Sequence, residues 1–217
     1  MAMKTPDQIA ADLDGIIQSH YYSEDFELSS SLRSYVDGLD ARELNLYEQV
    51  ALGRLMRDGS MVDIMLCTAA RIPSACPILA EKLNREPMSN QLTRVLITAL
   101  QRCDSDEAYR AVERFLDSDQ EAEALQALAL IDFCRTIPVL SRLLAKEHLH
   151  GIILHIVFER FRAVGMESLI RDLNASSATR SPVFHRGLES ALTSKKDPYN
   201  PFSPGQIRHM ITSLNRP

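Results

Sequence analysis

The sequence predicts an all-α fold, an α-α superhelix in which antiparallel helical hairpins stack in a row. A helix-spaced apolar pattern recurs about every thirty residues between Cys76 and Leu173. Short turns separate the apolar segments, and the alternating β-branched runs typical of strands are missing. Hairpins of this kind cannot bury both faces alone, so they gain stability by stacking into a curved array without a single closed core.

The repeat is visible at three inward positions of the second helix of each hairpin. These positions are spaced i, i+3 and i+7, which places them on one stripe of an α-helix. Equivalent residues are separated by 33, 28 and 29 residues along the chain. The pattern predicts a buried stripe on each second helix, formed by these residues: Cys76, Leu79 and Leu83; Tyr109, Val112 and Leu116; Ile137, Leu140 and Leu144; Met166, Leu169 and Leu173.

An apolar first helix precedes each second helix. Residues that favour turns or helix ends separate the two, and loops this short make neighbouring helices antiparallel. The expected breaks are at Pro73, at Asp104 and Ser105, at Arg135 and Thr136, and at Gly165. The predicted first helices cover residues 61–70, 92–103, 122–134 and 152–164.

The segment before the repeats, residues 1–60, is predicted to be a helical N-terminal cap that continues into the array. Each of its helices opens with Thr, Asp or Ser, the side chains that accept hydrogen bonds from the first free N–H groups of a helix. The expected helices are 6–18, 26–37 and 41–57.

The repeats themselves are assigned to residues 61–175, and residues 176–217 are predicted to form C-terminal helices around a Pro-broken linker. A Ser-rich connection comes first, and three prolines interrupt the stretch 195–204. We expect helices near 182–193 and 205–214, the last one docked back on its own array.

The hairpins resemble the HEAT family of helical repeats, most clearly over residues 61–174. In TAARIPSACPILAEKLNRE (68–86) and LIDFCRTIPVLSRLLAKE (130–147), a small or apolar helix end, a Pro and a Leu-rich second helix recur as in that family. Tetratricopeptide repeats fit less well, because their spacing is longer and their small, Gly and aromatic positions do not appear in this register. The resemblance implies a HEAT- or armadillo-like solenoid whose second helices line a concave groove.

A ladder of arginines on the second helices is the candidate binding site. Arg114, Arg142 and Arg171 occupy the same repeat position, each two residues before an inward Leu. By the resemblance they would line the concave side and bind a protein or an acidic peptide, with Lys82 close by. The residues predicted to contact the partner are Arg110, Arg114, Arg142, Lys146 and Arg171.

The alternative for this ladder is structural. HEAT-like arrays often tie neighbouring repeats together with a carboxylate and an Arg, but the acid six residues upstream is missing here, where Ala108, Thr136 and Gly165 stand. Glu81 occupies the equivalent place in the first hairpin and would end or interrupt the strip.

A nucleic-acid-binding or DNA-repair protein is the alternative function. At fold level the chain also resembles the helical-repeat alkylpurine DNA glycosylases, whose site uses aromatic residues including Trp beside a catalytic Asp, but this chain has no Trp. A net charge of -5 and a pI near 5.7 give no general attraction to phosphate. Deoxyhypusine hydroxylases, another class on this scaffold, bind iron through His-Glu dipeptides, and none occurs here.

The sequence gives no sign of a catalytic or metal site. His148 and His150 would point about 200 degrees apart on a helix, and His155 lies in an apolar run, so capping or core roles are expected. No nucleophile-and-base arrangement, P-loop or dinucleotide glycine pattern is present. We therefore predict a noncatalytic protein with no cofactor and no metal.

Four cysteines occur singly, at Cys67, Cys76, Cys103 and Cys134, without a Cys-x-x-Cys pair. We expect free and mostly buried thiols that pack as small apolar residues. Free thiols and the lack of a secretory signal or membrane span predict a soluble cytoplasmic protein.

Charge is unevenly distributed along the chain. Residues 1–60 carry a net charge of -6, whereas residues 171–217 carry +4. Solvated outer faces and polar caps account for this distribution. The alternative is head-to-tail self-association of oppositely charged ends.

Overall fold

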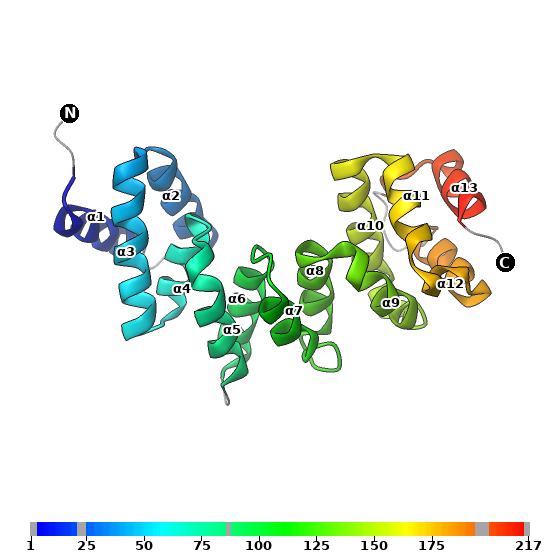
Figure 1. Cartoon of the computed structure of the whole chain (residues 1–217), viewed down its shortest axis with the longest axis horizontal. Helices are drawn as coiled ribbons and strands as arrows, with labels where there is room; N and C mark the ends of the chain where they lie inside the picture. The colour runs from blue at the N-terminus through cyan, green and yellow to red at the C-terminus, as the bar shows by residue number, and fades with distance from the viewer. Residues whose placement is uncertain (1–3, 21–24, 86–87, 194–199, 215–217) are drawn as a thin grey trace. The chain divides into compact units, whose positions relative to one another are not determined.

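The computed structural model describes residues 4–20, 25–85, 88–193 and 200–214, and these residues form α-helices and short 3-10 turns with no strand (Figure 1). The all-α prediction is confirmed for this part of the chain. None of the described helices is long and apolar enough to cross a membrane. The chain divides into two compact units, Met1–Ala111 and Val112–Pro217.

Unit 1 begins with three helices whose ends agree with the sequence prediction to within one residue. Local capping explains this agreement. Thr5 and Asp40, which precede the first and third helices, and Ser60, which precedes the fourth, each accept a hydrogen bond from the backbone N–H three residues on, and the side chain at that position bonds back to the cap. The helices of unit 1 are α1 (Pro6–Ser19), α2 (Asp25–Asp37), α3 (Ala41–Arg57), α4 (Met61–Ala69), α5 (Cys76–Asn84), α6 (Asn90–Leu100) and the greater part of α7 (Asp106–Glu113).

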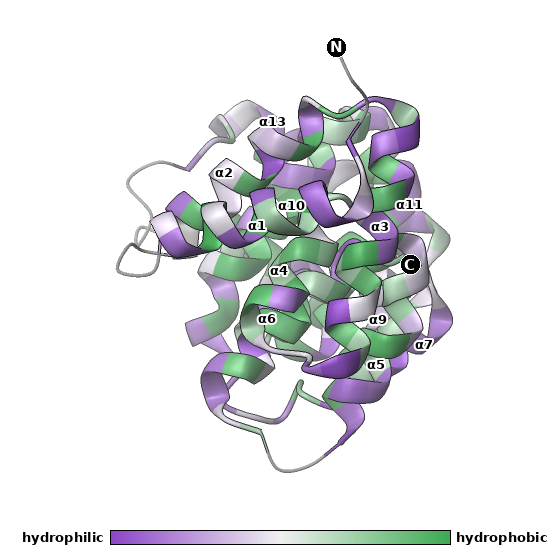
Figure 2. Ribbon diagram, turned by 90° about the vertical axis from the view of Figure 1, so that its left-hand side faces the viewer, coloured by the Kyte–Doolittle hydropathy of each residue, from purple (hydrophilic) through white to green (hydrophobic). Residues whose placement is uncertain are grey.

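The core of unit 1 centres on α4, which packs against α2, α3 and α6. Its Ile64 and Leu66 side chains are fully buried, and the hydroxyl of buried Tyr47 on α3 donates to the Leu66 carbonyl at 2.9 Å. Figure 2 shows the dense hydrophobic colouring of α4 and α6. α4 is therefore the element around which the ends of its neighbours are positioned.

The expectation of four free thiols is wrong for Cys76 and Cys103, which form a disulfide. Cys76 is the first residue of α5, Cys103 lies just beyond the end of α6, and the packing of these two helices brings the Cα atoms to 5.7 Å. Cys67 is a buried free thiol and Cys134 an exposed one. Disulfides persist mainly in oxidising compartments. The prediction of a cytoplasmic location therefore can no longer be based on free thiols.

Unit 2 continues the pattern of helical hairpins. Hairpins α8–α9 and α10–α11 each pack internally, α8 also contacts α10, and α9 contacts α11. The Ser-rich connection forms a 3-10 turn at Ser177–Arg180. The helices are α8 (Glu121–Ile131), α9 (Phe133–Leu143), α10 (His150–Val164), α11 (Met166–Ala175), α12 (Pro182–Leu192) and α13 (Pro204–Ser213).

The predicted break at Arg135 and Thr136 is wrong, because both residues lie in the first turn of α9. Asp132 is the true break. Its carboxylate accepts from the Arg135 N–H at 3.0 Å, and its carbonyl accepts from the Thr136 hydroxyl at 2.7 Å. Asp132 therefore caps α9, which begins at Phe133, before the predicted break.

The predicted inward stripes are buried. All of their members except Cys76 and Met166, which are half-buried, are buried in the structure. The repeat therefore marks the packed face of each second helix, as its spacing predicted.

The last helix docks on its own unit, as predicted. α13 packs on α11 and α12, and Asn174 donates to the Ser213 carbonyl at 3.0 Å. Phe202, which precedes α13, is buried against Phe158 and Phe161 of α10 with ring centroids 5.7 and 5.4 Å apart. Part of the predicted Pro-broken stretch, residues 194–199, lies outside the described residues.

Candidate functional site

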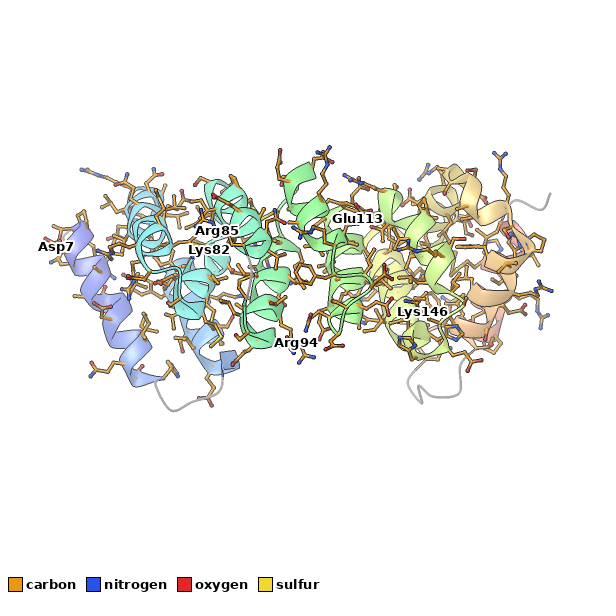
Figure 3. All side chains as sticks on the ribbon, turned by 90° about the horizontal axis from the view of Figure 1, so that it is seen from below. Asp7, Lys82, Arg85, Arg94, Glu113 and Lys146 are labelled. Carbon is orange, nitrogen blue, oxygen red and sulfur yellow. A yellow bond between two sulfur atoms is a disulfide. The ribbon has the colours of Figure 1, made fainter. Side chains whose placement is uncertain are left out.

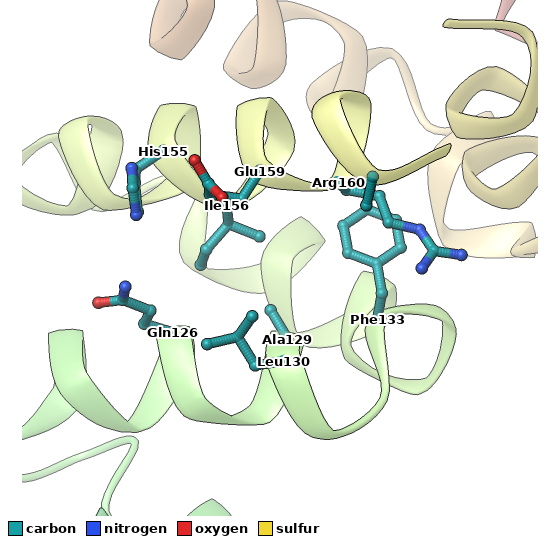
Figure 4. A pocket seen from close by; sticks show the side chains of 9 residues that line it. Gln126, Ala129, Leu130, Phe133, His155, Ile156, Glu159 and Arg160 are labelled. Carbon is teal, nitrogen blue, oxygen red and sulfur yellow. The ribbon is translucent and has the colours of Figure 1, made fainter. Parts of the chain in front are cut away.

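A groove of about 510 Å³ lies between α8 and α10 of unit 2 (Figure 4). The α8 side is formed by Gln126, Ala129 and Leu130 and ends at Phe133, the first residue of α9. The α10 side includes His155, Ile156, Glu159, Arg160 and Ala163. The groove is thus built wholly within one unit and from the first helices of two neighbouring hairpins.

Helical spacing explains why these side chains share one surface. The α8 residues follow an i, i+3, i+4 pattern, and the α10 residues recur every fourth position. Ala129 and Ala163 are small and leave room between the two helices. Beside them Leu130 projects with 53% of its surface exposed, one of the largest apolar exposures among the described residues. The result is an apolar hollow next to an apolar projection.

The charged groups of the groove are neutralised from within unit 2. The Arg160 guanidinium donates to the Asp172 carboxylate at 2.9 and 2.6 Å and lies over the Phe133 ring, 5.2 Å from its centroid. Glu159 accepts from Arg162 at 3.2 Å. Because these charges already have partners, the groove offers a ligand mainly apolar contact.

The structure divides the predicted basic strip between the two units. Lys82 and Arg110 belong to unit 1, and Arg110 pairs with Asp106 one turn away at 2.5 Å. Figure 3 shows Lys82 on α5 and Lys146 in unit 2. The remaining strip residues, all in unit 2, are Arg114, Arg142, Lys146 and Arg171.

The strip residues of unit 2 have different environments. Lys146 follows α9 and pairs with the carboxylate of Glu121, which is itself almost buried. Arg171 is exposed on α11 and donates to the Ser168 hydroxyl at 2.7 Å. Arg114 is exposed just beyond α7, and Arg142 is exposed on α9. The exposed Arg142 and Arg171 lie on α9 and α11, which pack against each other.

The histidines considered as metal ligands lie in different settings. His150 is buried and bonds to the Leu144 carbonyl at 3.0 Å, and His148 contacts the Glu121 carboxylate at 3.3 Å. His155 is exposed at the wall of the groove. Within the described ranges, no three His, Cys, Asp or Glu side chains are placed to hold a metal ion.

The groove residues were missed at the level of sequence because Leu130 belongs to an unbroken apolar run, Ala127–Ile131, in which every residue reads as core. Burial of Ala127 and Leu128 and exposure of Leu130 follow only from how α8 is rotated against α9 and α10. A residue-by-residue hydropathy pattern does not contain that rotation.

Together these features define an all-α protein of packed helical hairpins with an exposed apolar groove. No family model, no curated protein and no solved structure matches the chain. The groove is therefore the feature of the molecule that points to a function.

Proposed function

We propose that the protein is a noncatalytic scaffold or regulator that binds other proteins, and that its hairpins continue into a HEAT-like solenoid. The observation that carries the proposal is the groove between α8 and α10, with its apolar hollow and exposed Leu130. Exposed apolar patches with neutralised charges are typical of protein-binding surfaces, where a few apolar anchors supply most of the affinity.

The ligand that best fits this groove is an amphipathic helix. Two parallel walls of helix side chains with a small-residue floor accept apolar anchors spaced i, i+3 or i+4 on such a helix. Arg142 and Arg171 would then orient acidic residues of the same partner from the neighbouring second helices. In this arrangement the groove supplies most of the affinity for the partner helix, and the two arginines set its orientation.

The test compares Leu130→Asp with Val183→Asp. Both parent residues are exposed apolar side chains on helices of unit 2, but only Leu130 lines the groove. After circular dichroism shows equal helicity, partners are captured from the cells that make the protein. The partner so identified is then purified and titrated calorimetrically. We expect Leu130→Asp to weaken its binding roughly thirty-fold, as for a hot-spot residue, and Val183→Asp to leave it unchanged.

Equal binding by the wild type and both variants contradicts the groove proposal. An Arg142→Glu/Arg171→Glu variant in the same titration tests the arginines separately, with an expected loss that shrinks as salt is raised. If the captured partner is a second copy of the chain, the head-to-tail alternative replaces the adaptor. Binding to duplex DNA that falls steeply with salt would favour the nucleic-acid alternative.

A further inference from the structure

Three arginines of unit 1 have no bonded partner among the residues that the structure describes. Arg33 lies on α2, Arg71 follows α4 and Arg102 follows α6, and all three are exposed. α4 contacts both α2 and α6 (Figure 1), so the helices that carry or precede these arginines are neighbours. Across the described part of the chain, no carboxylate or carbonyl bonds to any of the three guanidinium groups.

A cavity of about 340 Å³ opens between the two loops that carry Arg71 and Arg102. Thr68 and Ser105 are also among its lining residues. Burial first, and then the positive charges of Arg33 and Arg71, lower the pKa of the Arg102 guanidinium below its usual value. The three cations therefore repel one another, and an anion placed among them would relieve that repulsion.

Arg71 is held in a backbone conformation that favours glycine. Its φ is +53°, and it is the one described residue other than glycine with a positive φ. The Arg71 N–H donates to the Thr68 carbonyl at 3.3 Å and the Ile72 N–H to the Cys67 carbonyl at 3.2 Å, the pattern that ends a helix with a left-handed residue. Glycine would adopt this conformation without strain, so the arginine side chain is present at a conformational cost.

The disulfide fixes the two loops relative to each other. Cys103 directly follows Arg102, and Cys76 lies five residues after Arg71. The bond between them also forms part of the cavity wall. It therefore limits how far Arg71 and Arg102 can move apart.

Two carboxylates, Asp104 and Glu107, line the same cavity. Neither pairs with the three arginines, and their charge makes the site unfavourable for a long polyanion such as a nucleic acid. A compact anion would have to bind at Arg71 and Arg102, which line the same cavity. Arginine is suited to such an anion because its planar fork donates two parallel hydrogen bonds to phosphate oxygens.

We propose that Arg71 and Arg102, which line this cavity, form a binding site for a compact oxyanion of the phosphate-monoester class, with the positive charge of Arg33 nearby. The ligand is either free phosphate or a phosphorylated side chain, since both present the same oxygens. The site lies in unit 1 and does not depend on the groove of unit 2. The rival explanation is that Arg71 and Arg102 only complement the partial negative charge at the ends of α4 and α6.

The first experiment titrates the ¹⁵N-labelled full-length protein with inorganic phosphate at constant ionic strength. A peptide containing one phosphoserine and its unphosphorylated twin are titrated in parallel. We expect chemical-shift changes at the Arg71 and Arg102 backbone and side-chain signals with phosphate and with the phosphopeptide, and none with the unphosphorylated peptide. Much tighter binding of the phosphopeptide than of phosphate would identify a phosphorylated protein as the source.

The variants separate binding from stability. Arg102→Ala and Arg71→Gly should each weaken phosphate binding about ten-fold, the effect of losing one charge-assisted contact. Arg71→Gly should do so without lowering the melting temperature, because it also relieves the strained backbone. The matched control is Arg186→Ala, an exposed arginine on α12 of unit 2 outside the groove and the arginine strip, which should bind phosphate like the wild type.

The proposal is overturned if neither phosphate nor the phosphopeptide shifts these signals. It is also overturned if Arg71→Gly and Arg102→Ala bind phosphate as tightly as Arg186→Ala, which is the outcome that a purely structural role of the arginines predicts. Protein capture by the groove can succeed in either case, so failure here leaves the proposed scaffold function untouched.

Discussion

The two hollows of this protein differ in how their charges are balanced. In the unit 2 groove, Arg160 is bonded to Asp172 and covered by Phe133, so the surface left for a ligand is mainly apolar. In the unit 1 cavity, Arg71 and Arg102 have no bonded partner among the described residues. An arginine beside a hollow therefore does not by itself indicate an anion site. The hollow favours an anion only where the arginine has no carboxylate partner within the protein.

The largest expected effect concerns the disulfide, which only the unit 1 cavity has. Cys103→Ser removes a bond that closes a loop across a sequence separation of 27 residues, and the loss should cost about 3.5 kcal/mol of the free energy of unfolding. Urea unfolding followed by circular dichroism and by unit-specific NMR signals measures this. Unit 1 should unfold earlier while the unit 2 transition stays where it was.

Cys134→Ser is the control for that experiment, because it removes an exposed free thiol. It should change the unfolding free energy by less than about 0.5 kcal/mol. Treating the wild type with a dithiol reductant should reproduce the Cys103→Ser result. A wild type that is unaffected by the reductant would mean that the bond does not form in solution.

The second largest effect is expected when the carboxylate that pairs with Arg160 in the groove is removed. Asp172→Ala leaves the half-buried Arg160 without its carboxylate, which should destabilise unit 2 by about 2 kcal/mol. The freed charge makes the groove resemble the unit 1 cavity. In the phosphate titration, new shifts should therefore appear at Arg160. If phosphate causes no shifts at the groove in this variant, the pairing of Arg160 with a carboxylate does not explain why the two hollows favour different ligands.

The sequence predicts most of the fold because the signals that define helix ends are local. Residues 41–57 were predicted to be helical and are helical, since Asp40 and Glu43 form a reciprocal cap within three residues. The break between α8 and α9 was misplaced because Asp132, rather than the residues just before Pro138, caps α9. A single interior proline did not prevent the helix from forming on both sides of it.

The disulfide and the sites depend on contacts that are distant in sequence. The start of α5 meets the end of α6, but Cys76 and Cys103 belong to different predicted hairpins, and single cysteines without a motif gave no reason to pair them. Arg110 was predicted to be available, yet Asp106, one turn away, pairs with it. Arg71 and Arg102 stand at helix ends, and their convergence requires α4 to pack against α6.

The smallest effect concerns the two free thiols. Burial and the charge of Asp63 raise the pKa of Cys67 from 9.0 to about 12, whereas exposed Cys134 has a pKa raised by partial burial and by nearby Asp172. Only the thiolate reacts, so at pH 8 only about one Cys67 thiol in ten thousand is ionised. Iodoacetamide should label native Cys134 first and Cys67 only on unfolding, as mass spectrometry of the digested protein would show.

The sign of the linked pH effect follows from the same shift. The unfolded chain loses the Cys67 proton near pH 9, whereas the folded chain keeps it until about pH 12, so ionisation favours unfolding in between. The unfolding free energy of unit 1 should therefore fall as the pH rises above 9, and a Cys67→Ala variant should lose this part of the fall. Rapid labelling of Cys67 in the native protein at pH 8 would contradict the buried position.

The most direct test of the difference between the two hollows is a paired titration of one ¹⁵N-labelled sample. Inorganic phosphate is added first, and then an amphipathic helical peptide with leucines at every third or fourth position and no net charge. We expect phosphate to shift Arg71 and Arg102 in unit 1, and the peptide to shift Ala129, Leu130 and Ala163 in unit 2. Shifts of the same residues by both ligands, or phosphate shifts confined to the groove, would contradict the account.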